Sequence, residues 1–356
     1  MIKIAFLGDI SFNDQYIDLY EQGKNPFAKI SSFLHDQDLV VGNLECIAEG
    51  NSGGNELKKP RLKTTANTLE YLKELNVKLV TLANNHVYDN LDDGFRNTIN
   101  YLEANSINSI GAGLEIQDAG KPFFYYKDGL KFCFLSFLTP DTNPCLPQNA
   151  QVFLNIYNEE TIIKEIQLYK TECDYLFLLL HWGGRFEGGG FPDYYQISSA
   201  RAFIKAGAHA IIGHHSHTLQ PFESISGKMV FYSLGNFCFS DIHFEGKKRS
   251  MSEKKFTESV IPVFQFTKEK SSLALFPIKN ENLYIEEKKQ ILRKLHIRNF
   301  FFFFIRFKFF WRIYYFSFKY IRPFIRQLKR KDEKKSLLKR IFTLNKSKFK
   351  QLIGYK

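Results

Sequence analysis

The chain has 356 residues, 44% of them hydrophobic, which is enough for a substantial core in one large domain or two smaller ones. Its formal net charge of +12 is concentrated at one end: residues 288–356 contain 22 Lys and Arg but only two acidic residues, so residues 1–287 carry a charge of −8. The five cysteines include no Cys-x-x-Cys pair, which argues against a disulfide framework and against a zinc ribbon.

Apolar runs along the first 280 residues predict nine strands, at 2–8, 38–42, 78–83, 131–138, 174–181, 208–213, 229–234, 259–266 and 272–277. Helical patterns between some of them predict helices at 92–104, 159–170 and 196–206. This alternation is typical of an α/β domain, which we expect to cover residues 1–280. The later strands, which have less helix between them, are expected to be antiparallel additions.

The first strand begins directly after Met1, without the basic region, apolar region and cleavage site of a secretory signal. The lack of a disulfide pattern fits a reducing compartment. We therefore expect the folded part of the chain to stay in the cytoplasm.

Metal-competent side chains stand where the predicted strands end. In chain order they are Asp9, Asn43, Glu45, Asn85, His86, His181, His214, His215 and His217. In a sheet wound with helical crossovers, ligands gather outside the carboxyl ends of the strands, so these residues are expected to converge. Because an imidazole costs free energy to bury without a partner, the histidines are better explained as metal ligands than as core residues. A hydrogen-bonded cluster without metal is the alternative.

Six segments of these strand ends follow one another in a recognisable order: Gly8-Asp9, Gly42-Asn43-Leu44-Glu45, Asn84-Asn85-His86, His181-Trp182-Gly183, Gly213-His214-His215-Ser216-His217 and Tyr232-Ser233-Leu234-Gly235-Asn236-Phe237. This ordered set, within about residues 1–240, resembles the capsule synthesis protein CapA family. That family is named for poly-gamma-glutamate capsule production and looks like a branch of the calcineurin-like metallophosphoesterases. The resemblance implies a four-layer αββα sandwich with a one- or two-metal centre between its sheets.

The resemblance also implies a role for each matched residue. Asp9 is expected to be a carboxylate ligand of the catalytic centre, Asn85 an amide ligand and His181 an imidazole ligand. The doubled histidine leaves the register of the last motif open. We favour His215 and His217 as ligands over His214, because alternate residues of an extended segment project to the same side.

Two departures from the phosphoesterase pattern affect the number of metal ions. Ser11 stands where the first motif usually has a histidine, and Asn43 stands where a bridging aspartate is usual. A neutral amide cannot hold two cations as a carboxylate does, although Glu45 can compensate as a ligand. We therefore expect one divalent ion, of Mn, Fe, Zn or Mg, rather than two.

A metal in this place implies hydrolysis, most simply of a phosphate ester, because it lowers the pKa of a bound water from 15.7 towards ~7. His86 is expected to donate the proton that the leaving oxygen needs or to steady the transition state. Asp89 is a candidate to orient the ring of His86, and a helix N-cap role for Asp89 or Asn90 is the alternative.

Two glycine-rich loops, at 50–55 and 183–190, lie next to the proposed ligands in sequence. Such loops can act as lids, and basic residues on or after them suit a phosphorylated or polymeric anionic substrate. The candidates for substrate binding are Arg61, Lys63, Arg185 and Asn236. The alternatives are plain surface loops and, for Asn236, a residue that completes a tight turn.

The basic tail, 288–356, is predicted to be helical and to associate with a membrane. Residues 300–320 contain fourteen aromatic residues, and on a helix the cations Lys308, Arg312, Lys319, Arg322 and Arg326 fall within about 80° of arc. Because burying these cations is costly, we expect residues 300–340 to lie flat on an anionic membrane surface rather than to span it. Nucleic acid is the competing partner, but five consecutive phenylalanines exceed what base stacking requires.

These observations predict a metal-dependent hydrolase of CapA type, attached peripherally to the inner face of the plasma membrane. We expect it to act in assembly or export of a capsule or other surface polymer, together with capsule synthesis proteins. A catalytically weak scaffold of a capsule synthesis complex and a nucleic-acid phosphoesterase are the alternatives.

Overall fold

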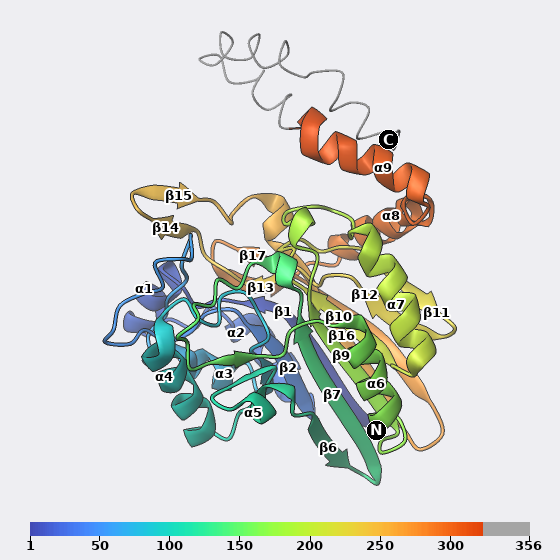
Figure 1. Ribbon diagram of the computed structural model, residues 1–356, viewed down its shortest axis with the longest axis horizontal. Helices are drawn as coiled ribbons and strands as arrows, with labels where there is room; N and C mark the ends of the chain where they lie inside the picture. The colour runs from blue at the N-terminus through green and yellow to red at the C-terminus, as the bar shows by residue number, and fades with distance from the viewer. Residues whose placement is uncertain (323–356) are drawn as a thin grey trace. The chain divides into compact units, whose positions relative to one another are not determined.

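The computed structural model describes residues 1–322 (Figure 1). The chain divides into two compact units, Met1–Phe302 and Phe303–Lys356. The first unit contains two large β-sheets and most of the helices, and the second continues the basic tail.

The first sheet has a parallel half and an antiparallel half. Its strand order is β18-β17-β16-β1-β2-β3-β4, and a short strand, β13, pairs in parallel with the end of β1. Strands β1 to β4 are parallel to one another, whereas β16, β17 and β18 are antiparallel additions, as expected. The bounds are β1 Ile2–Ile10, β2 Leu39–Leu44, β3 Val77–Thr81, β4 Asn108–Ile110, β13 Asn236–Cys238, β16 Glu258–Phe266, β17 Ser271–Glu281 and β18 Tyr284–Glu287.

The second sheet is parallel in its centre and antiparallel at both edges. Its order is β11-β12-β10-β9-β7-β6, in which β12, β10, β9 and β7 run parallel. The edge strands β11 and β6 each form an antiparallel hairpin with their neighbour. The bounds are β6 Phe123–Lys127, β7 Leu130–Leu138, β9 Tyr175–His181, β10 Ala210–His214, β11 Phe222–Ile225 and β12 Lys228–Phe231.

The main core lies between the two sheets. On β1, alternate residues point to opposite faces: Ile2, Ile4 and Phe6 pack in the core between the sheets, whereas Ala5 and Leu7 face the helices. The ring of Phe6 lies 5.0 Å from the ring of Phe177 on β9 and 5.7 Å from that of Phe264 on β16, measured between centroids. Each such aromatic pair stabilises the fold by about 0.5–1.5 kcal/mol in addition to the gain from burying its apolar surface. These contacts hold the two sheets face to face.

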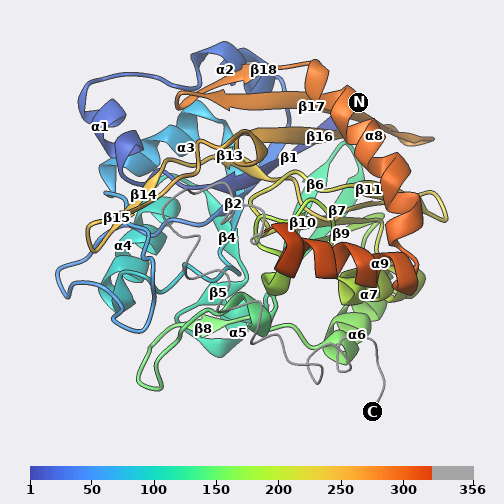
Figure 2. The same cartoon turned by 90° about the horizontal axis from the view of Figure 1, so that it is seen from above.

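Helices cover the outer faces of both sheets (Figures 1 and 2). Helices α1 to α4 pack on the first sheet through Leu19, Ile30, Leu34, Leu72 and Phe95, which share one core with the outer residues of β1, β2 and β3. Helices α6 and α7 lie along the second sheet. The bounds are α1 Gln15–Glu21, α2 Ala28–His35, α3 Tyr71–Glu74, α4 Leu91–Ala104, α6 Glu159–Tyr169 and α7 Tyr194–Ala206.

The α/β class and the three predicted helices are confirmed, although several element ends differ from the prediction; β17, for example, continues to Glu281 rather than ending at residue 277. Helix α7 begins at Tyr194, earlier than predicted, because Asp193 and Gln196 form a capping box at its N-terminus. Strand β12 ends at Phe231 rather than at residue 234, because the chain turns at Gly235, whose φ is +73°.

Smaller elements complete the first unit. Two short hairpin-like sheets pair β5 with β8 and β14 with β15. The bounds are β5 Ala112–Gly113, α5 Ile116–Gly120, β8 Phe153–Leu154, β14 Ile242–Phe244 and β15 Lys247–Arg249, with single 3-10 turns η1 Asn67–Glu70, η2 Pro140–Thr142, η3 Gly184–Phe186 and η4 Lys254–Phe256.

The basic tail begins with helix α8, Gln290–Ile305, whose first part is held in the first unit. Leu295 and Phe302 are buried there, the backbone N–H of Phe222 donates to Asn299 Oδ1 at 3.1 Å, and Lys294 pairs with Glu258. Helix α9, Lys308–Phe316, and a π-helical turn, η5 Ser317–Ile321, follow in the second unit. Among residues 1–322, no helix combines the length and the apolar character that crossing a membrane requires. The predicted membrane contact of residues 323–340 lies outside the described residues.

Candidate metal centre

The carboxyl ends of four parallel strands, two from each sheet, meet at one place in the first unit. Asp9 of β1 is directly opposite Asn43 of β2, and His181, the last residue of β9, is directly opposite His214, the last residue of β10. All four side chains are buried. The two sheets come into contact here, because His214 Nδ1 lies 3.2 Å from Asp9 Oδ1.

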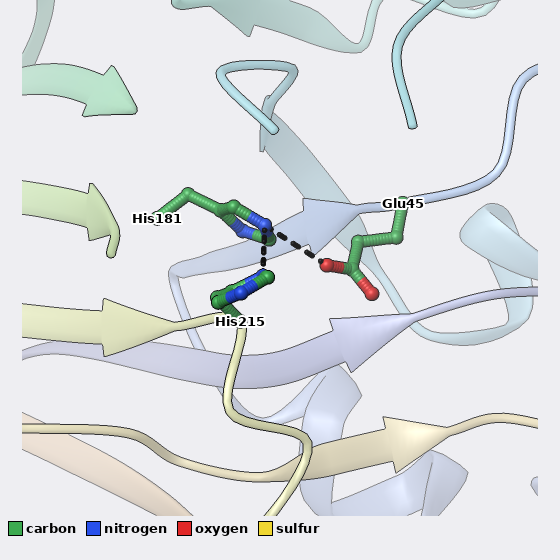
Figure 3. A group of neighbouring side chains, drawn as sticks. All are labelled: Glu45, His181 and His215. Carbon is green, nitrogen blue, oxygen red and sulfur yellow. Dashed lines mark hydrogen bonds and ion pairs between the residues drawn. The ribbon is translucent and has the colours of Figure 1, made fainter. Parts of the chain in front are cut away.

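Four donor atoms converge at His181, and Figure 3 shows three of the four residues, Glu45, His181 and His215. The Nε2 atom of His181 has three ligand-type neighbours: Asn85 Oδ1 at 3.0 Å, His215 Nδ1 at 3.0 Å and Glu45 Oε1 at 3.3 Å. We call these four residues the first donor group. Ligands held about 2.1 Å from a tetrahedral ion lie about 3.4 Å from one another. The three distances from His181 are close to this value, and the donor atoms of Glu45, His181 and His215 all lie within 4.8 Å of one another.

A second donor group shares Glu45 with the first and adds Asp9 and His217. His217 Nδ1 lies 3.3 Å from Asp9 Oδ2 and 3.6 Å from Glu45 Oε2. The same nitrogen lies 2.9 Å from Oδ1 of Asn236. Glu45 thus presents one carboxylate oxygen to each group, as a carboxylate between two cation sites would.

The donor atoms of the centre fit a divalent cation because several of them lack a hydrogen-bond donor. Among the described residues, Asp9 Oδ2, Asn43 Oδ1 and both carboxylate oxygens of Glu45 are buried without a hydrogen-bond partner. A buried carboxylate that is left unsatisfied costs several kcal/mol, and a metal ion is a common way to remove that cost. A cluster held by hydrogen bonds alone would not leave these oxygens unsatisfied.

Burial sets the protonation of the first donor group. It lowers the pKa of His181 well below its usual value and lowers that of His215 to about 4, so both rings are neutral near pH 7 and each has a lone pair for a metal. Burial raises the pKa of Glu45, and the charge of Asp9 raises it further.

His217 in the second group behaves differently. Burial alone would lower its pKa, but the carboxylates of Glu45 and Asp9 outweigh burial and raise the pKa to about 9. The same contacts work in the opposite direction on Asp9: the close approach of His214 and His217 to its carboxylate outweighs burial and holds its pKa well below the usual range. Without a metal, a proton on His217 therefore neutralises the second group.

At the metal centre, the backbone of β1 lies very close to the backbone just before β13. A Cβ on Gly8 would lie 2.0 Å from the carbonyl oxygen of Gly235, so only glycine lets β13 pair with β1 at Asp9. His215 and His217 have positive φ angles of 89° and 56°. Non-glycine residues adopt such angles rarely, and they cluster at functional sites, where the surrounding structure imposes them.

His86 and Asp89 form a buried pair beside Asn85. Nδ1 of His86 lies 2.6 Å from Asp89 Oδ2, which also accepts a 2.5 Å hydrogen bond from the backbone N–H of Leu62. Burial lowers the pKa of His86, as does the charge of Lys58, and burial raises the pKa of Asp89. Asp89 therefore orients the ring of His86. The alternative N-cap role is not seen for Asn90, which precedes α4 but makes no side-chain capping bond.

The other predicted site residues lie around the centre rather than in the donor groups. Asn43 donates from Nδ2 to Asp9 Oδ1 at 2.9 Å, which leaves its buried oxygen available to a cation. Asn236 uses both ends of its amide within the protein, on His217 and on the carbonyl of Phe256, so it positions His217 rather than facing a substrate. Ser11 donates to Asn13 and does not replace the missing histidine.

The predicted substrate-binding cations lie on the surface. Arg61 and Lys63 line a cavity of about 410 Å³ between residues 49–54 and the β14–β15 hairpin. The guanidinium of Arg61 stacks on Phe244 at 5.3 Å from the ring centroid and pairs with Glu56 at 3.0 Å. Arg185 is exposed on the turn η3.

Two charged residues near the centre were not predicted as site residues. Glu187, from the glycine-rich loop after β9, lies 3.9 Å from His217 Nε2 and pairs with Arg249; burial raises its pKa, but the charges of His217 and Arg249 outweigh burial and lower it to about 2. Lys58 is buried and donates to the carbonyl of Asn143 at 2.9 Å. Both stand in segments that the sequence marks as loops, where no periodicity indicates which side chain turns inward.

Sequence comparison connects the chain to known proteins. The bacterial capsule synthesis protein family PGA_cap matches residues 3–241. The chain is 28% identical over 253 residues to the PGA biosynthesis protein CapA of Bacillus subtilis strain 168, covering 67% of this chain and 63% of that protein. It is 28% identical over 220 residues to the capsule biosynthesis protein CapA of Bacillus anthracis, covering 60% of this chain and 53% of that protein. The matched part thus spans between half and two thirds of the length of these relatives.

Structural comparison gives a consistent result at the level of fold. A Staphylococcus aureus structure, provisionally named a 5'-nucleotidase and solved in complex with alpha-ketoglutarate, superposes with a TM-score of 0.51 at 13% sequence identity. The alignment covers 83% of this chain and 58% of that chain. The fold of this chain therefore resembles that of this 5'-nucleotidase structure.

Proposed function

Since the chain belongs to the bacterial capsule synthesis protein family PGA_cap, we propose that it is a metal-dependent hydrolase that cleaves a phosphate ester during assembly or export of a capsule polymer. The observation that supports this most directly is the first donor group, in which two imidazoles, a carboxylate and an amide oxygen converge with the spacings of a metal site. A divalent ion held there would polarise a phosphoryl oxygen and make a water molecule more acidic.

The donor types narrow the choice of metal. Two neutral imidazole nitrogens suit Zn, Fe or Mn, whereas Mg prefers a shell of oxygen atoms. We therefore propose Zn, Fe or Mn over Mg. The four-atom first group is the stronger site, and the second group, which holds a proton on His217 near pH 7, is the weaker one.

His86 would act on the leaving group. The pKa directions of His86 and Asp89 both favour the uncharged forms, and a neutral Asp89 carboxyl donates its hydrogen to Nδ1 of His86. The ring hydrogen is then on Nε2, the atom directed away from Asp89. As that hydrogen passes to the oxygen that leaves the phosphorus, Nδ1 takes the hydrogen of Asp89, so that His86 stays neutral and Asp89 becomes a carboxylate.

The experiment is a paired measurement of metal content and turnover on the purified protein. We expect about one equivalent of bound metal and hydrolysis of an aryl phosphate that increases with added Mn. A His181→Ala variant is expected to lose both. A wild-type protein that binds metal but hydrolyses no phosphate ester would remove the hydrolase proposal and retain the metal site.

A second candidate function is a scaffold of the capsule synthesis complex with little catalytic activity. It is favoured by the burial of the centre: His86 is only 6% exposed and Asn85 only 7%, which restricts entry of a polymer substrate. Capsule assays of the His181→Ala and His217→Ala variants distinguish the two functions. Loss of capsule in both variants, with the protein still folded, supports catalysis, and normal capsule supports the scaffold.

A further inference from the structure

The second unit carries an unusually apolar surface. Between residues 303 and 322, seven large apolar side chains are 41–68% exposed: Phe303, Phe304, Phe307, Phe309, Phe310, Ile313 and Ile321. We call this set the aromatic surface. The rings of Phe303, Phe304, Phe307, Phe309 and Phe310 form a chain of mutual contacts. An exposed apolar group of this kind in a folded protein is typical of a surface that another molecule covers.

The charged residues in the described part of the second unit are all positive. Residues 303–322 contain Arg306, Lys308, Arg312, Lys319 and Arg322 and no acidic residue. Several of these cations lie over aromatic rings: Arg306 is 4.3 Å from the ring centroid of Phe303 and 5.5 Å from that of Phe307, and Arg322 is 5.7 Å from that of Tyr314. Arg306 therefore lies over two rings of the aromatic surface itself.

This combination identifies the class of partner. Aromatic rings concentrate at the boundary between lipid headgroups and acyl chains, and Lys and Arg beside them are attracted to anionic headgroups. Pairing with the same surface of a second copy would place cations against cations, and nucleic acid would leave most of the phenylalanine area unburied. No helix among residues 1–322 has the length and apolar character needed to span a bilayer, so insertion across the membrane is not indicated.

We propose that the aromatic surface binds the interface of a bilayer that contains anionic lipid, with α9 lying along the membrane plane. Phenylalanine and isoleucine side chains enter the headgroup boundary, and the five cations contact lipid phosphates. This inference does not depend on hydrolysis, because membrane binding requires no residue of either donor group.

The two tryptophans of the chain give a specific readout. Trp182 is 1% exposed in the first unit, where its Nε1 donates to the carbonyl of Tyr232. Trp311 lies on α9, stacked on Tyr315 with 5.2 Å between ring centroids. Vesicles that carry brominated acyl chains should therefore quench Trp311 and leave Trp182 unaffected, and a Trp311→Phe variant should show no quenching.

The binding test uses co-sedimentation with vesicles of phosphatidylcholine alone and with 30% phosphatidylglycerol. We expect the full chain to bind the anionic vesicles at least about tenfold more tightly than the neutral ones. A Phe309→Ser/Phe310→Ser variant is expected to lose about tenfold or more in binding to anionic vesicles. The matched control is Ile116→Ser/Tyr126→Ser, which changes residues that are 74% and 65% exposed in the first unit and should bind as the wild type does.

Unchanged melting temperature and metal content in both double variants show that the first unit is intact. Equal binding by the Phe309/Phe310 variant and the wild type would overturn the proposal. So would the absence of Trp311 quenching, or tighter binding to single-stranded nucleic acid in a gel shift than to the anionic vesicles.

Discussion

Nδ1 of His215 lies 3.0 Å from Nε2 of His181, a distance that one shared proton or one shared cation can bridge. Burial lowers the pKa of both rings, so neither carries a charge of its own near neutral pH. His181 ends a strand of the second sheet, and His215 follows the neighbouring strand in a strained turn. The strand order of the sheet therefore produces a pair of imidazoles that is ready to accept a metal.

Replacement of either imidazole should remove the metal. Because each supplies one of the four atoms of the first donor group, His181→Ala and His215→Ala are expected to weaken metal binding by at least about 100-fold. Isothermal titration calorimetry with Zn or Mn measures this directly. His35→Ala, which removes an exposed histidine of α2, is the control and should bind metal normally. Retention of full affinity in His215→Ala would mean that His214 supplies the nitrogen.

Metal binding should release protons and strengthen as the pH rises. With a pKa of about 9, His217 is protonated near pH 7, and a cation beside Glu45 and Asp9 competes with that proton. We expect release of about one proton per ion at pH 7, and less as the pH approaches 9. Calorimetry in buffers of different ionisation enthalpy measures the number, and it should be smaller in His217→Gln.

The same raised pKa predicts how the metal-free protein responds to alkali. The usual pKa of histidine, 6.5, is raised to about 9, so the ion pairs of His217 stabilise the fold fully below pH 6.5. This contribution is lost as the pH rises through about 9. Thermal melts of the chelator-treated protein should show a lower melting temperature at pH 9 than at pH 6.5. A melting temperature that rises over this range would contradict the assignment of the charge to His217.

Asp89→Asn should reduce turnover without removing the metal. The substitution keeps the size of the side chain but removes the carboxyl group that fixes the ring of His86 through the 2.6 Å contact. We expect the turnover number to fall by about 10- to 100-fold while metal affinity stays close to that of the wild type. Asp118→Asn, on the exposed face of α5, is the control. A fall in KM alone would argue against a role for His86 in leaving-group protonation.

Asn236→Ala tests the residue that positions His217. Both amide atoms of Asn236 are engaged, one on His217 Nδ1 at 2.9 Å and one on the carbonyl of Phe256 at 3.1 Å. Loss of such an outer contact typically costs about 10- to 100-fold in metal affinity. We expect that loss in the second donor group, measured as the disappearance of the weaker phase of a metal titration. Substrate affinity should be unaffected. This result would distinguish a role in positioning His217 from the substrate-binding role that the sequence predicts for Asn236.

Much of the fold follows from the sequence because its strands are apolar on both faces. The runs that became β1, β2, β9 and β10 are buried on both sides, so their composition identified them. The short edge strands β6, β11 and β18 were not predicted. Each pairs with the strand next to it in the chain, but its exposure pattern is mixed, so composition alone did not mark it as a strand.

The site was predictable to the extent that strand ends converge. Asp9, Asn85, His181 and His217 come within reach of Glu45 or of one another because parallel strands share one edge. The sequence could not show that Asn236 would turn towards His217, since that contact depends on the pairing of β13 with β1. Nor could it show that Glu187 and Lys58, both from loops, would bring their charges close to the donor groups.

The position of β13 affects how the first unit unfolds. The chain leaves the second sheet after β12 and joins the first sheet beside Asp9, where the backbone N–H of Asp9 donates to the carbonyl of Gly235 at 2.9 Å. Loss of either sheet would thus separate the proposed ligands, and an ion bound between them would cross-link both sheets. Heat-induced metal release and loss of β-structure should therefore coincide in a single transition, and chelation should lower the temperature at which that transition occurs.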